Sequence, residues 1–386
     1  MTRGPATWLM YAGLGYFNYL TCAMGPALPL LRGELAISYT VSSLHFTAFA
    51  VGLIFSGSLV DRVAGVLGRR ATFWLGIVGL GGGGLVIASG THASVTIAGA
   101  LAMGIFGGGT LSMTSTVLSE IHGAHQATAL TEANLVASAA GAAAPLLVGW
   151  LASATSWRAA FVLPAAVGAG ALFALRRMRL PEPRANDAER VPRANGLGLE
   201  FWTFWAILVL VDCIEFSMAA WASTYLRDAA GFSAASAATA ASLFLIGMLA
   251  GRGAGTRLLL QGAKPRALLK LALLTTVAGF LLFRLGPVAS FALVGLLLTG
   301  VGVANLWPLA LSLALGAAGD ARDAAASRAS LAAGVGAFSA PLALGAAADG
   351  LGIANAYWLV VPLVAAAWLL VEQTQRARAL SGTPNR

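Results

Sequence analysis

The chain has 386 residues, of which 58% are hydrophobic and only 10% are charged, and its mean hydropathy is +0.80. Soluble domains carry about 25% charged residues, so this composition excludes a soluble enzyme, a disordered protein and an ordinary nucleic-acid binder. The formal net charge of +9 indicates either contact with nucleic acid or the excess of positive charge on the cytoplasmic side of a membrane protein.

A membrane-spanning helix needs about 20 mostly apolar residues, and the chain contains twelve runs of this kind. All are predicted to be helices, because lipid leaves unpaired backbone groups unsatisfied and none of the runs alternates as a barrel strand does. We therefore predict an all-α membrane protein with twelve transmembrane helices. In chain order the predicted spans are 6–31, 39–60, 71–89, 94–118, 127–152, 157–178, 201–226, 234–256, 266–285, 288–315, 325–348 and 354–374.

The basic residues are distributed unevenly about these spans. With the N-terminus in the cytoplasm, twenty of the 24 Lys and Arg lie on or near the cytoplasmic side. The four at external ends are Arg32, Arg158, Arg227 and Arg284. This split predicts a multi-pass protein of the inner (cytoplasmic) membrane with both termini in the cytoplasm and no nucleic-acid partner.

The two halves of the chain resemble each other. The longest polar stretch, 179–199, carries Pro, Asn and alternating charges, so we predict a cytoplasmic linker between a bundle at 1–178 and a bundle at 200–386. At an offset of 195 residues Gly52 falls on Gly247, and at 196 Pro145 falls on Pro341. A parallel repeat of this kind predicts two pseudo-symmetric six-helix bundles with a substrate site between them.

A short motif between spans 2 and 3 resembles the signature of the major facilitator superfamily. It consists of Gly57, Asp61-Arg62 and then Gly68-Arg69-Arg70, with the second Gly four residues later than in the family pattern. The resemblance implies a secondary transporter that works by alternating access of two rocking bundles, with spans 1, 4, 7 and 10 around a central cavity. It implies no enzymatic activity.

Two acidic residues lie near the middle of span 7. Asp212 and Glu215 are three residues apart, which places them on one face of a helix. Two carboxylates this close in a poor dielectric do not both ionise easily, and a reversible proton site needs this property. We therefore predict proton coupling at this pair. Two alternatives stay open: direct binding of a cationic substrate, and a structural carboxylate satisfied by a neighbouring Tyr or Asn.

A cytoplasmic gate is predicted at the ends of several spans. A carboxylate such as Asp61 can meet a helix N-terminus, and an arginine such as Arg62 can form a charge-assisted bond. Contacts of this kind can hold one face of a transporter closed. The alternative for Arg62, Arg69 and Arg70 is that they only enforce the topology.

Span 5 and its repeat add further charges to this predicted gate. Glu132 falls on Arg328 of span 11, so the two are expected to pair with each other or with residues of the 2–3 and 8–9 turns. A proton relay and a passive helix-end charge are the alternatives for Glu132. Arg252 in span 8 belongs to a degenerate second copy of the signature and completes the predicted gate.

Polar and aromatic residues of spans 1 and 10 are candidates for the cavity wall. We predict that Asn18, Tyr19, Asn305 and Trp307 line it, because amides, hydroxyls and aromatic rings suit a small organic solute with polar and apolar faces. The alternative is that such side chains bond backbone groups or pack between helices.

The function predicted from the sequence is secondary active transport of a small organic solute, coupled to protons. The expected partners are this solute, protons and the lipid bilayer, with the protein acting as a monomer and without metal or cofactor. A cation or multidrug efflux antiporter is the alternative, although span 4 lacks the Arg before its glycine cluster that drug–proton antiporters of this family favour. A non-transporting sensor and a membrane-embedded enzyme are remoter alternatives.

Overall fold

A computed structural model describes residues 2–175, 180, 197–286 and 288–380 of the chain. Most of the predicted linker at 179–199 lies outside these residues. The described residues are almost entirely helical and form two compact units. Unit 1 holds helices α1 to α6 together with Ser223–Ser242, and unit 2 holds α7 up to Ala222 and the helices from Leu243 onward.

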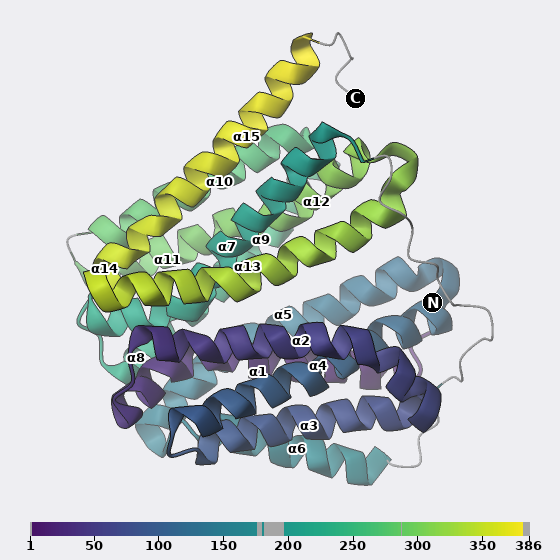
Figure 1. The fold of residues 1–386 in the computed structure, drawn as a ribbon, viewed down its shortest axis with the longest axis vertical. Helices are drawn as coiled ribbons and strands as arrows, with labels where there is room; N and C mark the ends of the chain where they lie inside the picture. Colours follow the sequence, from purple (N-terminus) through teal and green to yellow (C-terminus); the bar gives the residue numbers. More distant parts are fainter. Residues whose placement is uncertain (1, 176–179, 181–196, 287, 381–386) are drawn as a thin grey trace. The chain divides into compact units, whose positions relative to one another are not determined.

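Unit 1 contains six long helices joined by short turns (Figure 1). Its predicted spans therefore correspond one to one to observed helices. The bounds are α1 Pro5–Leu35, α2 Tyr39–Leu67, α3 Arg69–Ser89, α4 Ala93–His122, α5 Gln126–Ala154 and α6 Ala159–Leu175, with a 3-10 turn at Gly123–His125 and the short α8, Ala234–Ala240, packed on this unit.

Unit 2 repeats this plan with more interruptions. Predicted span 10 is divided at Ala304 and Asn305 into α11 and α12, and the last span begins as a short helix followed by a 3-10 turn. The bounds are α7 Leu199–Asp228, α9 Ser242–Leu260, α10 Pro265–Leu285, α11 Ala289–Val303, α12 Leu306–Ala317, α13 Arg322–Leu351, α14 Ile353–Ala356 and α15 Val360–Leu380, with 3-10 turns at Gly319–Ala321 and Tyr357–Leu359.

Within the described residues, ten helical segments are long and apolar enough to cross a membrane. The remaining two predicted spans correspond to α1, which has 31 residues, and to α6, an apolar helix of 17 described residues. Large apolar side chains such as Ile54, Phe55 and Trp150 stay exposed on the helices. This outward apolar surface fits a lipid environment and not water.

Local sequence explains where several helices begin and end. The Ser38 side chain accepts a hydrogen bond from the Val41 backbone N–H at the start of α2, and its repeat counterpart Ser233 does the same for Ser236 at the start of α8. Gly68, with φ of 79°, ends α2 and begins α3. The extra residues before Gly68 thus lengthen α2, so Asp61 and Arg62 are helical and not in a loop.

Glycine contacts show that the repeat extends to packing. A Cβ at Gly99 would lie 2.8 Å from the Gly83 carbonyl oxygen, and a Cβ at the counterpart Gly295 would lie 2.7 Å from the Gly279 carbonyl oxygen. The same crossing therefore joins α3 to α4 and α10 to α11. Because no side chain fits there, the helices approach at backbone distance in both units.

Candidate transport site

Asp212 lies in the middle of α7 and is buried in unit 2. Its side chain is 6% exposed, and the Oδ2 atom has no hydrogen-bond partner among the described residues. A buried polar atom without a partner is costly, and a buried carboxylate without one costs much more. Such an atom in an otherwise apolar helix is a candidate functional group.

Glu215 stands one turn further along α7 and is only partly buried. Its negative charge acts on Asp212, and the positive charge of Arg252 on α9 acts on Glu215. The structure thus brings together three of the residues singled out in the sequence. The two carboxyls therefore have different electrostatic neighbours. A cation acts on Glu215, whereas a second carboxyl acts on Asp212.

Helix α7 is fastened to α13 along its length. The Trp205 indole donates to the Arg328 carbonyl oxygen at 2.7 Å, and the Trp221 indole donates to the Pro341 carbonyl oxygen at 3.1 Å. Between them the Cys213 thiol and the Ser339 hydroxyl lie 3.9 Å apart. We call these three contacts the α7–α13 seam. Arg328 therefore contributes its backbone to the seam, a role that the sequence did not indicate.

Asn305 lies at the break between α11 and α12. Its side-chain amide donates to the Gly251 carbonyl oxygen of α9 at 2.6 Å, and its side chain occupies the space that a Cβ at Gly255 would need. Trp307, two residues later, is partly buried. From the break between α11 and α12 the amide thus bonds the backbone of α9, which is the kind of contact that the structural alternative for this residue expects.

Asn18 and Tyr19 in α1 also bond to neighbouring helices of unit 1. The Asn18 amide donates to the Ala137 carbonyl oxygen of α5 at 2.7 Å, and the Tyr19 hydroxyl donates to the Ala160 carbonyl oxygen of α6 at 3.1 Å. Asn18 stays partly exposed, whereas Tyr19 is buried. Asn18 therefore remains available to a solute to a greater extent than Tyr19.

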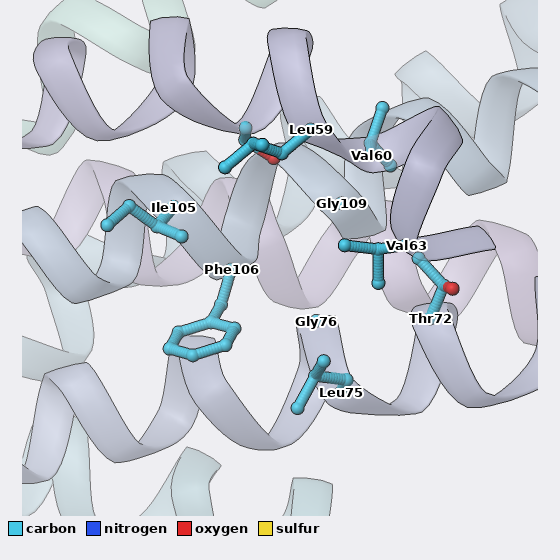
Figure 2. Close-up of a pocket in the computed structure, with 10 residues that line it drawn as sticks. Leu59, Val60, Val63, Thr72, Leu75, Gly76, Ile105, Phe106 and Gly109 are labelled. Carbon is cyan, nitrogen blue, oxygen red and sulfur yellow. The ribbon is translucent and has the colours of Figure 1, made fainter. Parts of the chain in front are cut away.

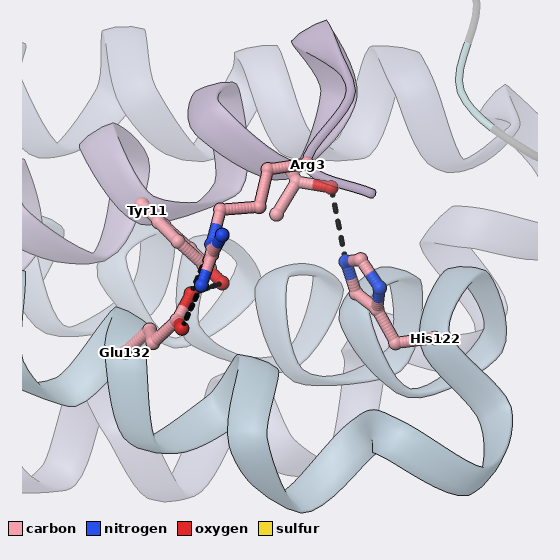
Figure 3. A network of polar contacts seen from close by, with 5 residues as sticks. Arg3, Tyr11, His122 and Glu132 are labelled. Carbon is pink, nitrogen blue, oxygen red and sulfur yellow. Dashed lines mark hydrogen bonds and ion pairs between the residues drawn. The ribbon is translucent and has the colours of Figure 1, made fainter. Parts of the chain in front are cut away.

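Glu132 forms a network with the N-terminal segment (Figure 3). The Arg3 guanidinium donates to both carboxylate oxygens, at 2.8 and 2.5 Å, and the Tyr11 hydroxyl donates to Oε2 at 2.8 Å. Next to it, the Thr7 hydroxyl and the His122 ring lie 3.0 Å apart. Arg3 and Tyr11 were missed in the sequence, where only the repeat suggested partners for Glu132.

The residues of the signature motif are placed differently from one another. Arg69 forms a bidentate ion pair with Glu120 of α4, in which Nη2 and Oε1 are 2.7 Å apart. Asp61, Arg62 and Arg70 are exposed on unit 1. Arg69 thus joins α3 to α4, while the others stand at the surface at this end of the unit.

An ionic cluster that the sequence did not single out closes the opposite end of unit 1. Arg32 of α1 pairs with Asp228 at the end of α7, and its guanidinium stacks 3.9 Å above the Tyr39 ring. The Tyr39 hydroxyl donates to Asp228 at 3.0 Å, and Arg227 donates to the Pro29 carbonyl oxygen. These contacts join α1, α2 and the end of α7, because opposite charges from separate spans meet at this end of the unit.

Unit 1 also contains an apolar recess between α2, α3 and α4 (Figure 2). Leu59, Val63, Leu75 and Phe106 line it, with Gly76 at its floor. No charged side chain is among the described residues that line it. The hydroxyls of Ser56 and Thr72 are the polar side chains among these residues, so the recess offers a polar solute few groups that would orient it.

Comparison with known proteins identifies the family to which this fold belongs. The family model of the Major Facilitator Superfamily matches residues 7–292. No curated protein sequence matches the chain.

Several solved transporter structures are similar along nearly the whole chain. A bacterial homolog of the human lysosomal transporter Spinster has a TM-score of 0.73 at 14% identity, covering 97% of this chain and 98% of that one. The nucleoside transporter NupG has a TM-score of 0.76 at 15% identity, covering 95% and 99%. A POT family transporter solved with a thioalcohol-conjugated peptide has a TM-score of 0.77 at 12% identity, covering 96% of each chain.

These identities establish the fold, and the family match covers most of the chain. Both agree with the helical composition and with the repeated packing of the two units. The chain belongs to the Major Facilitator Superfamily and is a multi-pass membrane protein with the architecture of a secondary transporter.

Proposed function

We propose that this transporter moves a small organic solute and couples the movement to protons through Asp212 and Glu215. The observation that carries the proposal is the buried Asp212 Oδ2 atom, which has no hydrogen-bond partner in the part of the chain that the structure describes. A carboxyl in this position is stable when neutral, and it needs water or a cation when it loses its proton. The protonated side chain is therefore stable when it is buried, and the deprotonated side chain is stable when it contacts water or a cation.

Glu215 supplies the second half of this proposed site. Arg252 offsets part of the cost of burying a negative charge on Glu215, and it does not act in this way on Asp212. The same cation weakens the competing idea that the pair holds a cationic drug, since Glu215 already has a positive neighbour. The proposal therefore favours proton coupling over cation efflux.

The remaining residues take supporting roles in the proposal. Asp61, Arg62, Arg69, Arg70, Glu132, Arg252 and Arg328 form the gate on the cytoplasmic side, and Asn18, Tyr19, Asn305 and Trp307 line the path of the solute. We place the protein in the inner membrane as a monomer with both termini in the cytoplasm, which the distribution of basic residues supports.

The test begins with a search for the solute. Nucleosides and short peptides form the first panel, because similar folds include a nucleoside transporter and a peptide-bound transporter. Each is screened by its effect on thermal unfolding of the purified protein, since a ligand that binds the folded state raises the unfolding temperature. A stabilising solute then becomes the probe for transport.

Uptake of that solute is measured in proteoliposomes with a pH gradient of either sign and with none. We expect wild-type uptake to follow one sign of the gradient, and Asp212→Asn and Glu215→Gln to lose the gradient-driven part while keeping exchange of solute for solute. Gradient-driven uptake that survives unchanged in both variants would disprove proton coupling at this pair.

A further inference from the structure

The backbone of α13 lies directly against the Asp212 carboxyl. A Cβ built at Gly336 would stand 2.7 Å from both the Cβ and the Oδ2 atoms of Asp212. Atoms this close must separate, and neither helix backbone can yield cheaply. The absence of a side chain at Gly336 is therefore what allows α13 to cover this carboxyl.

The contact between Asp212 and Gly336 differs from its nearest equivalent in unit 1, where a Cβ at Gly141 would collide with the Asn18 amide nitrogen. At offsets of 195 and 196 residues the two positions correspond to Phe17 and Ala140. An apolar ring and a methyl group stand there, and Gly15 provides the close approach to Ala140 in that unit. A polar side chain under a glycine thus occurs in both units, and the carboxyl in this place is particular to unit 2.

The charges around Asp212 do not compensate an ionised carboxylate. On its own helix Glu215 adds a second acid and no positive charge, and Arg252 of α9 acts on Glu215. The described charged side chains of α13 nearest in sequence, Arg328 and Asp349, lie 8 and 13 residues from Gly336. A negative charge on Asp212 would therefore be buried without a partner, which costs several kcal/mol, so the closed arrangement requires the neutral acid.

The two indole contacts on either side of this point carry no titratable group, and the Cys213 thiol between them can titrate only at alkaline pH. Trp205 and Trp221 donate to backbone oxygens of α13, and Cys213 meets Ser339. Pro341 lies five residues after Gly336 and leaves the Ala337 carbonyl without its usual helical partner, so α13 can bend there. The tryptophans can hold the ends of the seam while its middle separates.

We infer that Gly336 is the positioning residue for Asp212, and that the middle of the α7–α13 seam closes over the neutral acid and opens when Asp212 releases its proton to water. This inference rests on the proposed role of Asp212 as the proton site, but it concerns the movement that the proton controls. Opening admits water to the carboxylate and gives it the hydrogen bonds that it lacks in the closed seam.

The test compares two glycines on the same helix. For Gly334, no atom of a neighbouring segment lies within 4 Å of an added Cβ among the described residues, so Gly334→Ala is the matched control for Gly336→Ala. Backbone hydrogen exchange of peptides from α7 and α13 is followed by mass spectrometry in the purified protein at acidic and alkaline pH. Variants are compared with the wild type at the same pH, which removes the intrinsic pH dependence of exchange.

In the wild type and in Gly334→Ala, we expect the peptides around Gly336 to be protected at acidic pH. At alkaline pH they should exchange faster than in Asp212→Asn, by about tenfold for an opening that becomes easier by ~1.4 kcal/mol. Asp212→Asn should stay protected at both pH values. Gly336→Ala should exchange rapidly even at acidic pH, because the seam cannot close.

Several results would overturn the inference. Equal exchange in Gly336→Ala and Gly334→Ala would show that Gly336 does not position the carboxyl. A pH-dependent opening that persists in Asp212→Asn would assign the opening to another group. If Gly336→Ala does not fold, the double variant Asp212→Gly/Gly336→Ala removes every Asp212 side-chain atom from the collision and should recover protection; a double variant no better than Gly336→Ala alone would refute the contact.

Failure of this inference and failure of the proposed function are distinguishable. The exchange measurement needs no solute, so a seam that opens with pH in a protein whose uptake ignores the gradient would leave the inference standing and refute proton coupling. A seam insensitive to pH, with gradient-driven uptake that depends on Asp212, would do the reverse.

Discussion

Arg3 donates two hydrogen bonds to Glu132, a residue 129 positions away in the sequence. The carboxylate also accepts a hydrogen bond from Tyr11, so the segment before α1 is fastened to α5 through one acidic side chain. Glu132 therefore has partners within unit 1 for both oxygens. Any role in a gate would have to exchange these contacts for others.

The first prediction concerns this N-terminal contact. Arg3→Ala and Glu132→Gln should each release the segment before α1, since both remove the charge-assisted pair. Limited proteolysis should then cleave the N-terminal segment faster in either variant than in the wild type. Combining the two should add nothing further, and strictly additive effects would show that they act through different contacts.

The second prediction compares glycines at helix crossings. A Cβ at Gly104 would meet the Phe49 carbonyl, and one at the counterpart Gly300 would meet the Phe244 carbonyl. Gly104→Ala and Gly300→Ala should each lower the free energy of unfolding by about 1–3 kcal/mol, the range for overpacking a tight interior.

The control for Gly104→Ala lies in the same helix, and the control for Gly300→Ala lies in the following helix. At Gly109 in α4 and Gly316 in α12 no described atom of a neighbouring segment is within 4 Å of an added Cβ. Gly109→Ala and Gly316→Ala should be neutral or stabilising by up to about 1 kcal/mol. Thermal unfolding in detergent is the measurement, and equal losses at crossing and control positions would contradict the packing argument.

The third prediction separates two adjacent arginines. Arg69 is bonded to both oxygens of Glu120, whereas Arg70 is exposed. Arg69→Lys should destabilise unit 1, because an ammonium group does not reproduce the bidentate hydrogen bonding of the guanidinium. Arg70→Lys keeps the charge at an exposed position and should have no effect on the unfolding temperature. A pair of variants with the same unfolding temperature would show that the ion pair contributes little.

The fourth prediction concerns the cluster at the other end of unit 1. Asp228→Asn removes the negative charge that pairs with Arg32 and leaves a partly buried guanidinium without its counter-charge. We expect a loss of about 1–3 kcal/mol in unfolding free energy, with a smaller loss for Tyr39→Phe, which keeps the ring beneath Arg32 and removes only the hydroxyl. The ranking would be wrong if Tyr39→Phe proved the more damaging change.

Much of the fold could be predicted because membrane insertion depends on local composition. The spans that contain Asp212 and Glu132 were located as apolar runs, and the repeat relating Gly52 to Gly247 recurs as a packing contact with α4 and with α11. The end of α2 was not located in this way, because the predicted span stops at residue 60 whereas the helix continues to Leu67. A helix that must cross about 30 Å of hydrocarbon is visible in any window of 20 residues.

The partners of the charged residues could not be predicted in the same way. The repeat suggested Arg328 for Glu132, but Glu132 bonds Arg3, and the Arg328 carbonyl accepts from Trp205. Asn18, chosen as a cavity residue, bonds a carbonyl of α5. Such contacts depend on which helices lie side by side and how they are rotated, which no periodicity within one helix determines.

Sequence alone therefore determined the solvent of this protein, its family and the position of its intramembrane acids, because hydropathy and short motifs are local properties. Tertiary structure decided what surrounds those acids. The two carboxyls of α7 are nearly equivalent in the sequence, yet only Asp212 lies beneath the backbone of Gly336, while Glu215 has Arg252 nearby. That difference arises from the packing of α7 against α13 and α9, and it sets the energetic cost of a charge at each site.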